Sequence, residues 1–555
     1  MTSNLLKAIT MNRCKTWMAL LLLVFSAVQA MADQAHSEWT VVQQPDGTSM
    51  TVRLCGDEWH HYYISSDGTM VTPDDDGVFR PVVGFSRLLR SPRRTHAVAR
   101  RMERRHYASM LSNGEERRGL VVMVQFPDRQ FSFADSKSQW DAILNEEGYS
   151  QHGTPGSVHD YFMDQSRGLF NLKFDVAGPV TLSKSVYYYG QNDDFGDDLY
   201  LDQLIAEACE QIKDQVDFRD YDWDGDGVVD QLYILYAGYS ENYGGNDKRL
   251  IWPHEYWLTA YPDYPEGLKI DGVVIDTYAC SGELYGWQST QQTVLSGLGT
   301  FCHEFSHCLG LPDFYADADN LGSWDLMASG EKNAYGWCPA GYSAYERMFC
   351  GWLQPEELDE PASVRLMQPL SDGGGAYLVR NVCPVDSVDE FYLLENRQQR
   401  GWDASLSGHG LLVFHVDYSQ FAWDNNLVNT SRSHQRYRII AANGTTSRAS
   451  QYAAYPYLAN DSLTDTSSPA ARVFNVNVRQ RQFMGKPITA ISESADGLVS
   501  FDFMGGTASG IADVSRLTDE RQQTVFDLGG RHVPAVENKK RIYKPTKSIH
   551  KKLKL

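Results

Sequence analysis

The sequence lacks the features of a nucleic-acid-binding or membrane-spanning protein. Its 71 Asp and Glu residues outnumber its 50 Lys and Arg residues, and the resulting net charge of −21 argues against a nucleic-acid partner. Beyond the N-terminus, no apolar run approaches the roughly 20 residues that a membrane-spanning helix needs. We therefore expect no integral membrane span. The sequence also has no internal repeat.

The cysteines are few and scattered. No C-x-x-C pair occurs among the nine of them, which excludes a zinc ribbon built from thiolates. Cys14 lies in the N-terminal segment, and the remaining eight are Cys55, Cys209, Cys280, Cys302, Cys308, Cys338, Cys350 and Cys383. An oxidising compartment would permit disulfides, but their connectivity does not follow from the spacing.

Residues 1–32 have the three parts of a secretory signal peptide. Arg13 and Lys15 precede the apolar run 18–25, and small residues follow between Ala27 and Ala32. The run is too short to span a membrane. A buried apolar helix is the alternative interpretation. We expect the mature protein to be exported and to act outside the cell or at its surface.

Residues 33–118 have the pattern of a propeptide. Short strand-like runs alternate with turns such as 45–47 and 66–68 up to about residue 86, which predicts a small β-rich unit. Ten arginines then lie between Arg87 and Arg118. This stretch fits either a solvated basic helix face or a linker that trypsin-like proteases cut.

Residues 119–354 predict an α/β or α+β domain. Residues 119–126 and 232–237 read as buried strands, and residues 200–213 place their apolar side chains on one helical face. From 355 to 506 the helical signal fades, and runs such as 392–394 and 410–414 predict the strands of a β-sandwich. Such a domain could contact a cell surface or glycans. Residues 507–555 form a tail with a basic end.

An H-E-x-x-H motif lies at residues 303–307. His303 and His307 share one helical face one turn apart, so that both imidazoles can bind one Zn²⁺. Glu304 can reach the water that the metal activates without binding the ion itself. It is therefore the predicted general base, which takes the proton of the water and later passes it to the leaving amine.

The third zinc ligand has two candidates. Gly310 can adopt the left-handed conformation that ends a helix, so that Asp313 can turn back toward the metal. Three protein ligands leave the fourth tetrahedral position for water. The alternative is Glu346, which lies in a helical pattern further along the chain, as in another class of zinc peptidases. We favour Asp313.

Met327 lies in the turn-like segment 322–330 soon after this motif. A tight turn with a methionine at this position matches the Met-turn of metzincins, which lies beneath the zinc site without binding the metal. A lone methionine would otherwise be ordinary core. Tyr335, Tyr342 and Tyr345 are candidates for holding the oxyanion, and the sequence does not choose among them.

A second candidate metal site lies in the acidic segment 220–230. Its pattern D-x-D-x-D-G resembles the front of a calcium loop, with candidate ligands Asp222, Asp224, Asp226 and Asp230. The bidentate glutamate of a regulatory loop is missing, because Tyr233 occupies its position. The segment therefore predicts a structural Ca²⁺ site, with a solvated acidic turn as the alternative.

On residues 303–315 and 323–330 the sequence resembles the immune-inhibitor-A-like family of secreted metallopeptidases. The likeness extends through 119–126, 157–170, 224–238, 250–257 and 342–348 to 391–403 and 408–417. It implies a metzincin-like zinc protease domain, a zymogen with a propeptide, a β-rich domain after the catalytic one, and bound zinc and calcium. It also implies that His303, His307 and Asp313 bind zinc, with Glu304 catalytic and Met327 beneath.

Two segments depart from this pattern. Cys55 could cap the zinc of a latent form, and Asp57 is an equal candidate. Residues 525–531 resemble a type IX secretion sorting segment, but the last residues lack its usual partner strand, so that release and surface attachment both stay open.

The function that these features predict is zinc-dependent hydrolysis of protein or peptide substrates by a secreted endopeptidase. One alternative is a zinc exopeptidase or amidase. The other is a surface binding or adhesion protein with a vestigial protease domain.

Overall fold

The computed structural model describes residues 113–506 except for short gaps at 194–195, 244–246, 289–292, 316–319 and 386. It also describes most of residues 35–81 and three short strands between residues 511 and 533. The predicted signal peptide, the arginine-rich stretch up to residue 112 and most of the predicted sorting tail lie outside the described residues.

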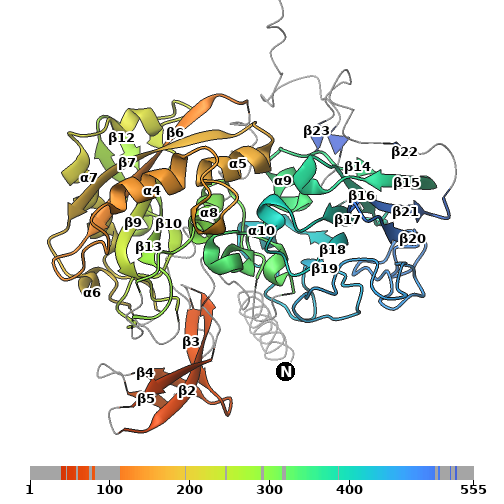
Figure 1. Cartoon of the computed structure of the whole chain (residues 1–555), viewed down its shortest axis with the longest axis horizontal. Helices are drawn as coiled ribbons and strands as arrows, with labels where there is room; N and C mark the ends of the chain where they lie inside the picture. The colour runs from red at the N-terminus through yellow and green to blue at the C-terminus, as the bar shows by residue number, and fades with distance from the viewer. Residues whose placement is uncertain are drawn as a thin grey trace, which may run out of the picture.

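A five-stranded mixed sheet forms the centre of the first half of the body (Figure 1). Four of its strands run parallel, and one antiparallel strand lies at an edge. Their order across the sheet is β10 (His254–Trp257), β13 (Thr277–Leu284), β9 (Leu232–Tyr239), β6 (Glu116–Gln125) and β7 (Asn171–Thr181). A small second sheet consists of β11 (Leu268–Ile270), β12 (Val273–Ile275) and β8 (Val228–Val229).

Helices cover both faces of the central sheet, because its inner strands β6 and β9 carry buried apolar residues on both sides. In β6, Val121 and Met123 join the cluster that contains α4 (Ser136–Asn145), α5 (Val158–Ser166) and α8 (Gly299–Cys308). Leu120, Val122 and Val124 point to the other face, toward α7 (Leu201–Ile212). The short helix α6 (Val186–Tyr189) packs on that face too. The predicted strands at 119–126 and 232–237 and the predicted helix at 200–213 are thus confirmed as β6, β9 and α7.

Two further sheets follow the central one in the chain, as the loss of helical pattern after residue 354 predicts (Figure 1). The predicted strands at 392–394 and 410–414 lie within the first of these sheets. It consists of β14 (Glu356–Glu357), β16 (Ala376–Arg380), β17 (Asp389–Arg397), β18 (Gly410–Tyr418) and β19 (Tyr437–Ile439). The second consists of β20 (Ile488–Glu493), β21 (Val499–Phe503), β15 (Ala362–Met367) and β22 (Ile511–Ala512).

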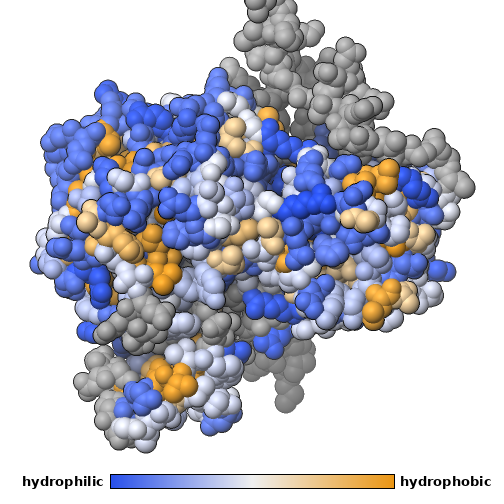
Figure 2. Space-filling view, viewed as in Figure 1, coloured by the Kyte–Doolittle hydropathy of each residue, from blue (hydrophilic) through white to orange (hydrophobic). Residues whose placement is uncertain are grey.

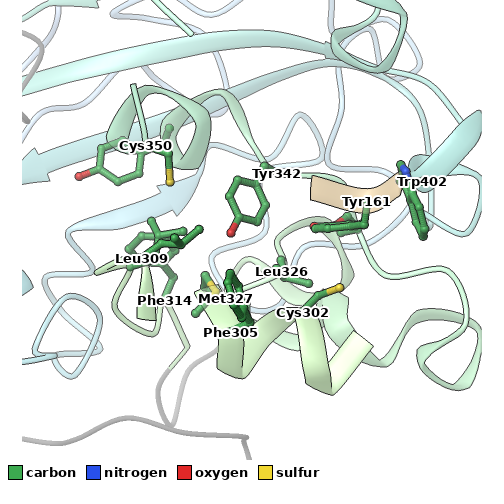
Figure 3. Packing of buried hydrophobic residues seen from close by; sticks show 14 of the residues in the cluster. Tyr161, Cys302, Phe305, Leu309, Phe314, Leu326, Met327, Tyr342, Cys350 and Trp402 are labelled. Atoms are coloured by element: carbon green, nitrogen blue, oxygen red, sulfur yellow. The ribbon is translucent and has the colours of Figure 1, made fainter. Parts of the chain in front are cut away.

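The first of these later sheets is buried on both faces. Tyr392 and Leu394 of β17 face the second sheet, with Phe501 and Phe503 of β21 in the same cluster. Phe391 and Leu393 point the other way, into the core that contains helix α8. The core beneath α8 therefore includes residues from both sides of the predicted boundary at 354. Figure 3 shows part of it, with Phe305, Met327 and Tyr342 in one packed cluster.

The N-terminal region is a separate antiparallel sheet (Figure 1, red). It touches the body through β3 (His60–Ser65), where the ring of His61 stacks on Trp252 at a centroid distance of 4.5 Å. The Nε2 atom of His61 also lies 3.2 Å from a carboxylate oxygen of Glu241. The strands follow chain order: β1 (Thr40–Gln43), β2 (Ser49–Asp57), β3 (His60–Ser65), β4 (Met70–Pro73) and β5 (Phe79–Pro81).

Figure 2 shows a mostly hydrophilic face with scattered small hydrophobic patches. In the part of the chain that the structure describes, every helix is too short or too polar to cross a membrane.

A fully buried arginine links the two halves of the body. Arg397 of β17 pairs with Glu395 at 3.0 Å and with Asp403. Its guanidinium also donates hydrogen bonds to the carbonyl oxygens of Trp324 and Gly341, at 3.3 and 3.0 Å. A single side chain from the β-rich half of the body, which follows residue 354, thus binds two loops of the half that precedes it.

We expect Arg397→Met to lower the free energy of unfolding by about 3–5 kcal/mol, because the carboxylates of Glu395 and Asp403 would stay buried without their cation. Arg400→Met is the matched control. Its pair with Asp372 is exposed, with 47% of the Arg400 side chain accessible, and losing it should change the stability by at most about 1 kcal/mol. Urea unfolding of both variants measures the difference, and equal losses would contradict this role for Arg397.

Candidate metal and active site

Helix α8 carries the H-E-x-x-H motif into the core. The helix is anchored at its start by close backbone packing on the loop at 329–336. A Cβ atom on Gly299 would lie 1.9 Å from the carbonyl oxygen of Glu331, so this position requires glycine. The whole motif is consequently buried, with 0% exposure at both His303 and Glu304.

The two motif histidines have the same hydrogen-bonding arrangement. Nδ1 of His303 lies 3.0 Å from the carbonyl oxygen of Leu326, and Nδ1 of His307 lies 2.8 Å from that of Leu311. A carbonyl oxygen only accepts, so each Nδ1 must carry the proton. In the neutral form of each imidazole, the Nε2 atom then has its lone pair available for a metal, the arrangement that metal-binding histidines use.

Asp313 comes back to these histidines after the helix ends. Gly310 has φ of +93°, the left-handed conformation that the sequence predicts there. The Oδ1 atom of Asp313 lies 3.3 Å from Nε2 of His303 and 3.5 Å from Nε2 of His307. Burial disfavours the charged carboxylate, but the attraction of His307 and His303 outweighs it and holds the pKa of Asp313 below its usual range.

The donor set fits zinc. His303, Glu304 and His307 each offer a ligand atom within 4.8 Å of the others. Apart from the contacts with Asp313, the Nε2 atoms of His303 and His307 have no hydrogen-bond partner among the described residues, although both are buried. Two imidazole nitrogens with a nearby carboxylate are typical ligands of a catalytic zinc site. The H-E-x-x-H site therefore implies zinc.

The segment around Met327 is a hydrogen-bonded turn that packs against the metal-site residues. Asp325 organises a tight turn: its side chain accepts a hydrogen bond from the Met327 N–H at 3.0 Å, and its carbonyl oxygen accepts one from Ala328 at 3.2 Å. The carbonyl oxygen of Met327 accepts the N–H of Phe314 at 2.8 Å. The turn thus holds both His303, through Leu326, and the chain that carries Asp313. Met327 itself is fully buried.

Glu346, the alternative zinc ligand, has its contacts within its own helix. It is the third residue of helix α9 (Ala344–Phe349), where its carboxylate accepts the N–H of Ser343 at 2.6 Å in a reciprocal capping box. Burial raises its pKa to about 7. These contacts direct Glu346 to its own helix end, whereas Asp313 faces both histidines.

The three tyrosines considered for the oxyanion lie in different surroundings. The hydroxyl of Tyr342 contacts Ser306 of α8, and the ring of Tyr342 stacks on Trp352 at 5.4 Å. Tyr345 packs against Tyr437 and Phe314 in the same buried core. Tyr335 is 68% exposed. Tyr342 and Tyr345 are therefore used in packing beneath the site, and the geometry favours neither for oxyanion binding.

The predicted calcium loop brings three of its four aspartates together. Asp222, Asp224 and Asp230 have ligand oxygens within 4.8 Å of one another. The carboxylate of Asp226 instead accepts the N–H of Val228 at 2.8 Å. Asp222 accepts three backbone N–H groups, at 2.8 to 3.1 Å, from residues 225–227. The loop is thus ordered by its own hydrogen bonds as well as by any cation.

Sequence reasoning missed the residues that support the site from the β-rich half. Asn426 contacts Asp313, and Asn429 donates a hydrogen bond to the carbonyl oxygen of Phe314 at 2.6 Å. The hydroxyl of Tyr437 donates to Asp325 at 3.2 Å. These residues lie more than a hundred positions from their partners, so no local spacing could have revealed them.

Comparison with known proteins gives a family for this arrangement. A family model described as the immune inhibitor A peptidase M6 catalytic domain matches residues 108–353. The pre-pro-metalloprotease PrtV of Vibrio cholerae is 27% identical over 305 residues, which cover 46% of this chain and 32% of that protein. Immune inhibitor A of Bacillus thuringiensis subsp. alesti is 26% identical over 281 residues, which cover 43% and 40%.

A putative secreted metallopeptidase of the fungus Arthroderma benhamiae is 23% identical over 264 residues, 39% of this chain and 38% of that protein. The chain thus matches between about a third and two fifths of the length of these relatives. The matched family region contains α8, Asp313, Met327 and the central sheet. Residues 108–353 thus form an immune inhibitor A peptidase M6 catalytic domain.

Proposed function

We propose that this chain is a secreted zinc-dependent endopeptidase that is made as a zymogen. The observation that carries the proposal is the convergence of His303, His307 and Asp313 on one buried point, with Glu304 beside them. Family membership supports peptide-bond hydrolysis as the reaction. Protein or peptide substrates are the expected partners.

In this proposal the residues have distinct roles. His303, His307 and Asp313 hold the zinc, which supplies a Lewis acid for the scissile carbonyl and activates water for attack. Glu304 takes the proton of the attacking water and transfers it to the nitrogen of the leaving amine. The carbonyl groups of Leu326 and Leu311 keep both imidazoles in the required tautomer and orientation.

We infer a metzincin-like catalytic domain at 119–354, preceded by a propeptide at 33–118 and followed by a β-sandwich domain at 355–506. The names of two relatives support export and a propeptide, since one is called a pre-pro-metalloprotease and another a putative secreted metallopeptidase. The cluster between β17 and β21 supports the sandwich. Export through the N-terminal signal, and contact of the β-sandwich with a cell surface or glycans, belong to the same proposal.

We further propose a structural Ca²⁺ site at Asp222, Asp224 and Asp230, with Asp226 in the same loop. Three carboxylates that close to one another are stabilised by a divalent cation.

Glu304→Gln should reduce casein hydrolysis by about 10²- to 10⁴-fold, because the amide cannot accept the proton of the water. Zinc content should stay near one per chain. Glu210→Gln, which changes an exposed glutamate on α7, is the control and should leave activity unchanged. The assay uses the full-length chain before and after limited trypsin treatment. If the wild type holds zinc and cleaves no protein in either state, the amidase or binding interpretation replaces the endopeptidase.

Asp313→Ala should release zinc under dialysis conditions in which Glu346→Gln retains it, because only Asp313 faces both histidines. Glu346→Gln should instead lower the free energy of unfolding by about 1 kcal/mol through the weakened cap of α9. Zinc analysis by mass spectrometry and urea unfolding give the two readouts. Retained zinc in Asp313→Ala with lost zinc in Glu346→Gln would reverse the assignment.

Calcium should stabilise the wild type against heat, by about 2.7 kcal/mol when its concentration is 100 times the dissociation constant. Asp222→Asn should remove most of this effect, because Asp222 belongs to the carboxylate group of the loop. The exposed Asp214→Asn is the control. Calorimetry with calcium and with EGTA measures the shift. A calcium response that survives Asp222→Asn would place the cation elsewhere.

A further inference from the structure

One residue of the β-rich half is bonded directly to the proposed third zinc ligand. Asn426 makes two hydrogen bonds to Asp313, which lies 113 positions earlier in the chain. Its Oδ1 atom accepts the backbone N–H of Asp313 at 2.8 Å. Its Nδ2 atom donates to the Oδ2 atom of Asp313 at 2.9 Å. Both residues are buried, with 5% and 3% exposure, so water competes little for these bonds.

The two bonds determine which oxygen of Asp313 faces the histidines. The bond to the backbone N–H fixes the position of the residue, and the bond to Oδ2 fixes the rotation of the carboxylate. The other oxygen, Oδ1, is the one within 3.3 and 3.5 Å of the two Nε2 atoms. Without the amide donor, the carboxylate of Asp313 could rotate away from this orientation. Partners of this kind normally set the direction of a metal ligand.

The position of Asn426 is itself rigid. It follows helix α10 (Gln420–Asp424), and its N–H bonds to the carbonyl oxygen of Trp423 at 3.2 Å. Its φ of +51° is left-handed, a conformation in which asparagine is among the few residues that fit easily. The ring of Trp423 in turn packs near Phe314, at 6.3 Å between centroids. The asparagine side chain thus extends from a fixed helix end toward a fixed partner.

We propose that Asn426 is a positioning residue for the zinc site: it holds the carboxylate of Asp313 in the orientation that binds the metal. The inference rests on the proposed function, since it assumes zinc at His303, His307 and Asp313. It also makes the metal centre incomplete without the chain that follows residue 354. Loss of such a partner typically weakens metal binding by about 10- to 100-fold.

Two variants of the full-length chain separate the contribution of the side chain from that of the backbone. Asn426→Asp keeps an acceptor for the N–H of Asp313 but has no donor for its Oδ2 atom. Asn426→Gly keeps the left-handed backbone and removes both bonds. Asn425→Asp is the matched control, because it adds the same charge one residue earlier, where the one side-chain hydrogen bond within the described part of the chain goes to the carbonyl oxygen of Phe421.

The measurement is the zinc dissociation constant, obtained by competition with a chromophoric chelator, together with the visible absorption spectrum of the cobalt-substituted protein. We expect a roughly 10- to 100-fold weaker zinc affinity and an altered cobalt spectrum for both Asn426 variants. Asn425→Asp should match the wild type in both. At saturating zinc, the Asn426 variants should show a lower kcat with little change in KM, because the two side-chain bonds of Asn426 go to the proposed metal ligand Asp313.

Wild-type zinc affinity and an unchanged cobalt spectrum in folded Asn426→Asp would overturn the inference, whatever the melting temperature. If Asn426→Asp does not fold, Asn426→Gly decides in the same way. Failure of the proposed function would look different: the wild type would then bind no zinc, or Asp313→Ala would bind it as tightly as the wild type. Zinc lost in Asp313→Ala but kept in both Asn426 variants would reject this inference alone.

Discussion

The structure depends on one electrostatic constraint: the Nε2 atoms of His303 and His307 lie 3.3 and 3.5 Å from one carboxylate oxygen of Asp313, and all three residues are buried. Burying an ionised carboxylate is strongly unfavourable unless a cation or hydrogen bonds compensate it. The chain supplies part of that compensation through Asn426 and through the histidines. A divalent cation would supply the rest. The proposed zinc should therefore stabilise the fold as well as supply the chemistry.

The β-rich half takes part in this constraint. Arg397 binds the carbonyl oxygens on either side of the turn that contains Met327, while Tyr437 and Asn429 hold Asp325 and the chain at Phe314. The hydrophobic cluster beneath α8 continues through β17 and β18 without a break at residue 354. The catalytic half and the sheets that follow it are therefore physically coupled, and the geometry of the metal site reflects residues from both.

The features that the sequence alone predicted are those that depend on local residue patterns. The spacing of His303 and His307 and the left-handed Gly310 follow from helix geometry, and β6, β9 and α7 follow from apolar periodicity. For the third zinc ligand, the sequence favoured Asp313 but left Glu346 open; the contacts in the fold support Asp313, because Glu346 caps its own helix. The role of Asn426 could not be predicted from the sequence for the same reason, because it depends on a contact with a residue 113 positions away. The grouping of Asp222, Asp224 and Asp230 without Asp226 also depends on the loop's own hydrogen bonds.

The central claim is that His303, His307 and Asp313 hold one zinc ion, and X-ray absorption at the zinc edge of the purified full-length chain tests it most directly. The account predicts two imidazole nitrogens at about 2.0–2.1 Å, oxygen ligands at about 2.0–2.2 Å and no sulfur. Cys302 and Cys308 lie next to the histidines on α8, so a cysteine sulfur is the specific alternative ligand. A sulfur scatterer at about 2.3 Å, or a protein that carries no zinc, would contradict the account.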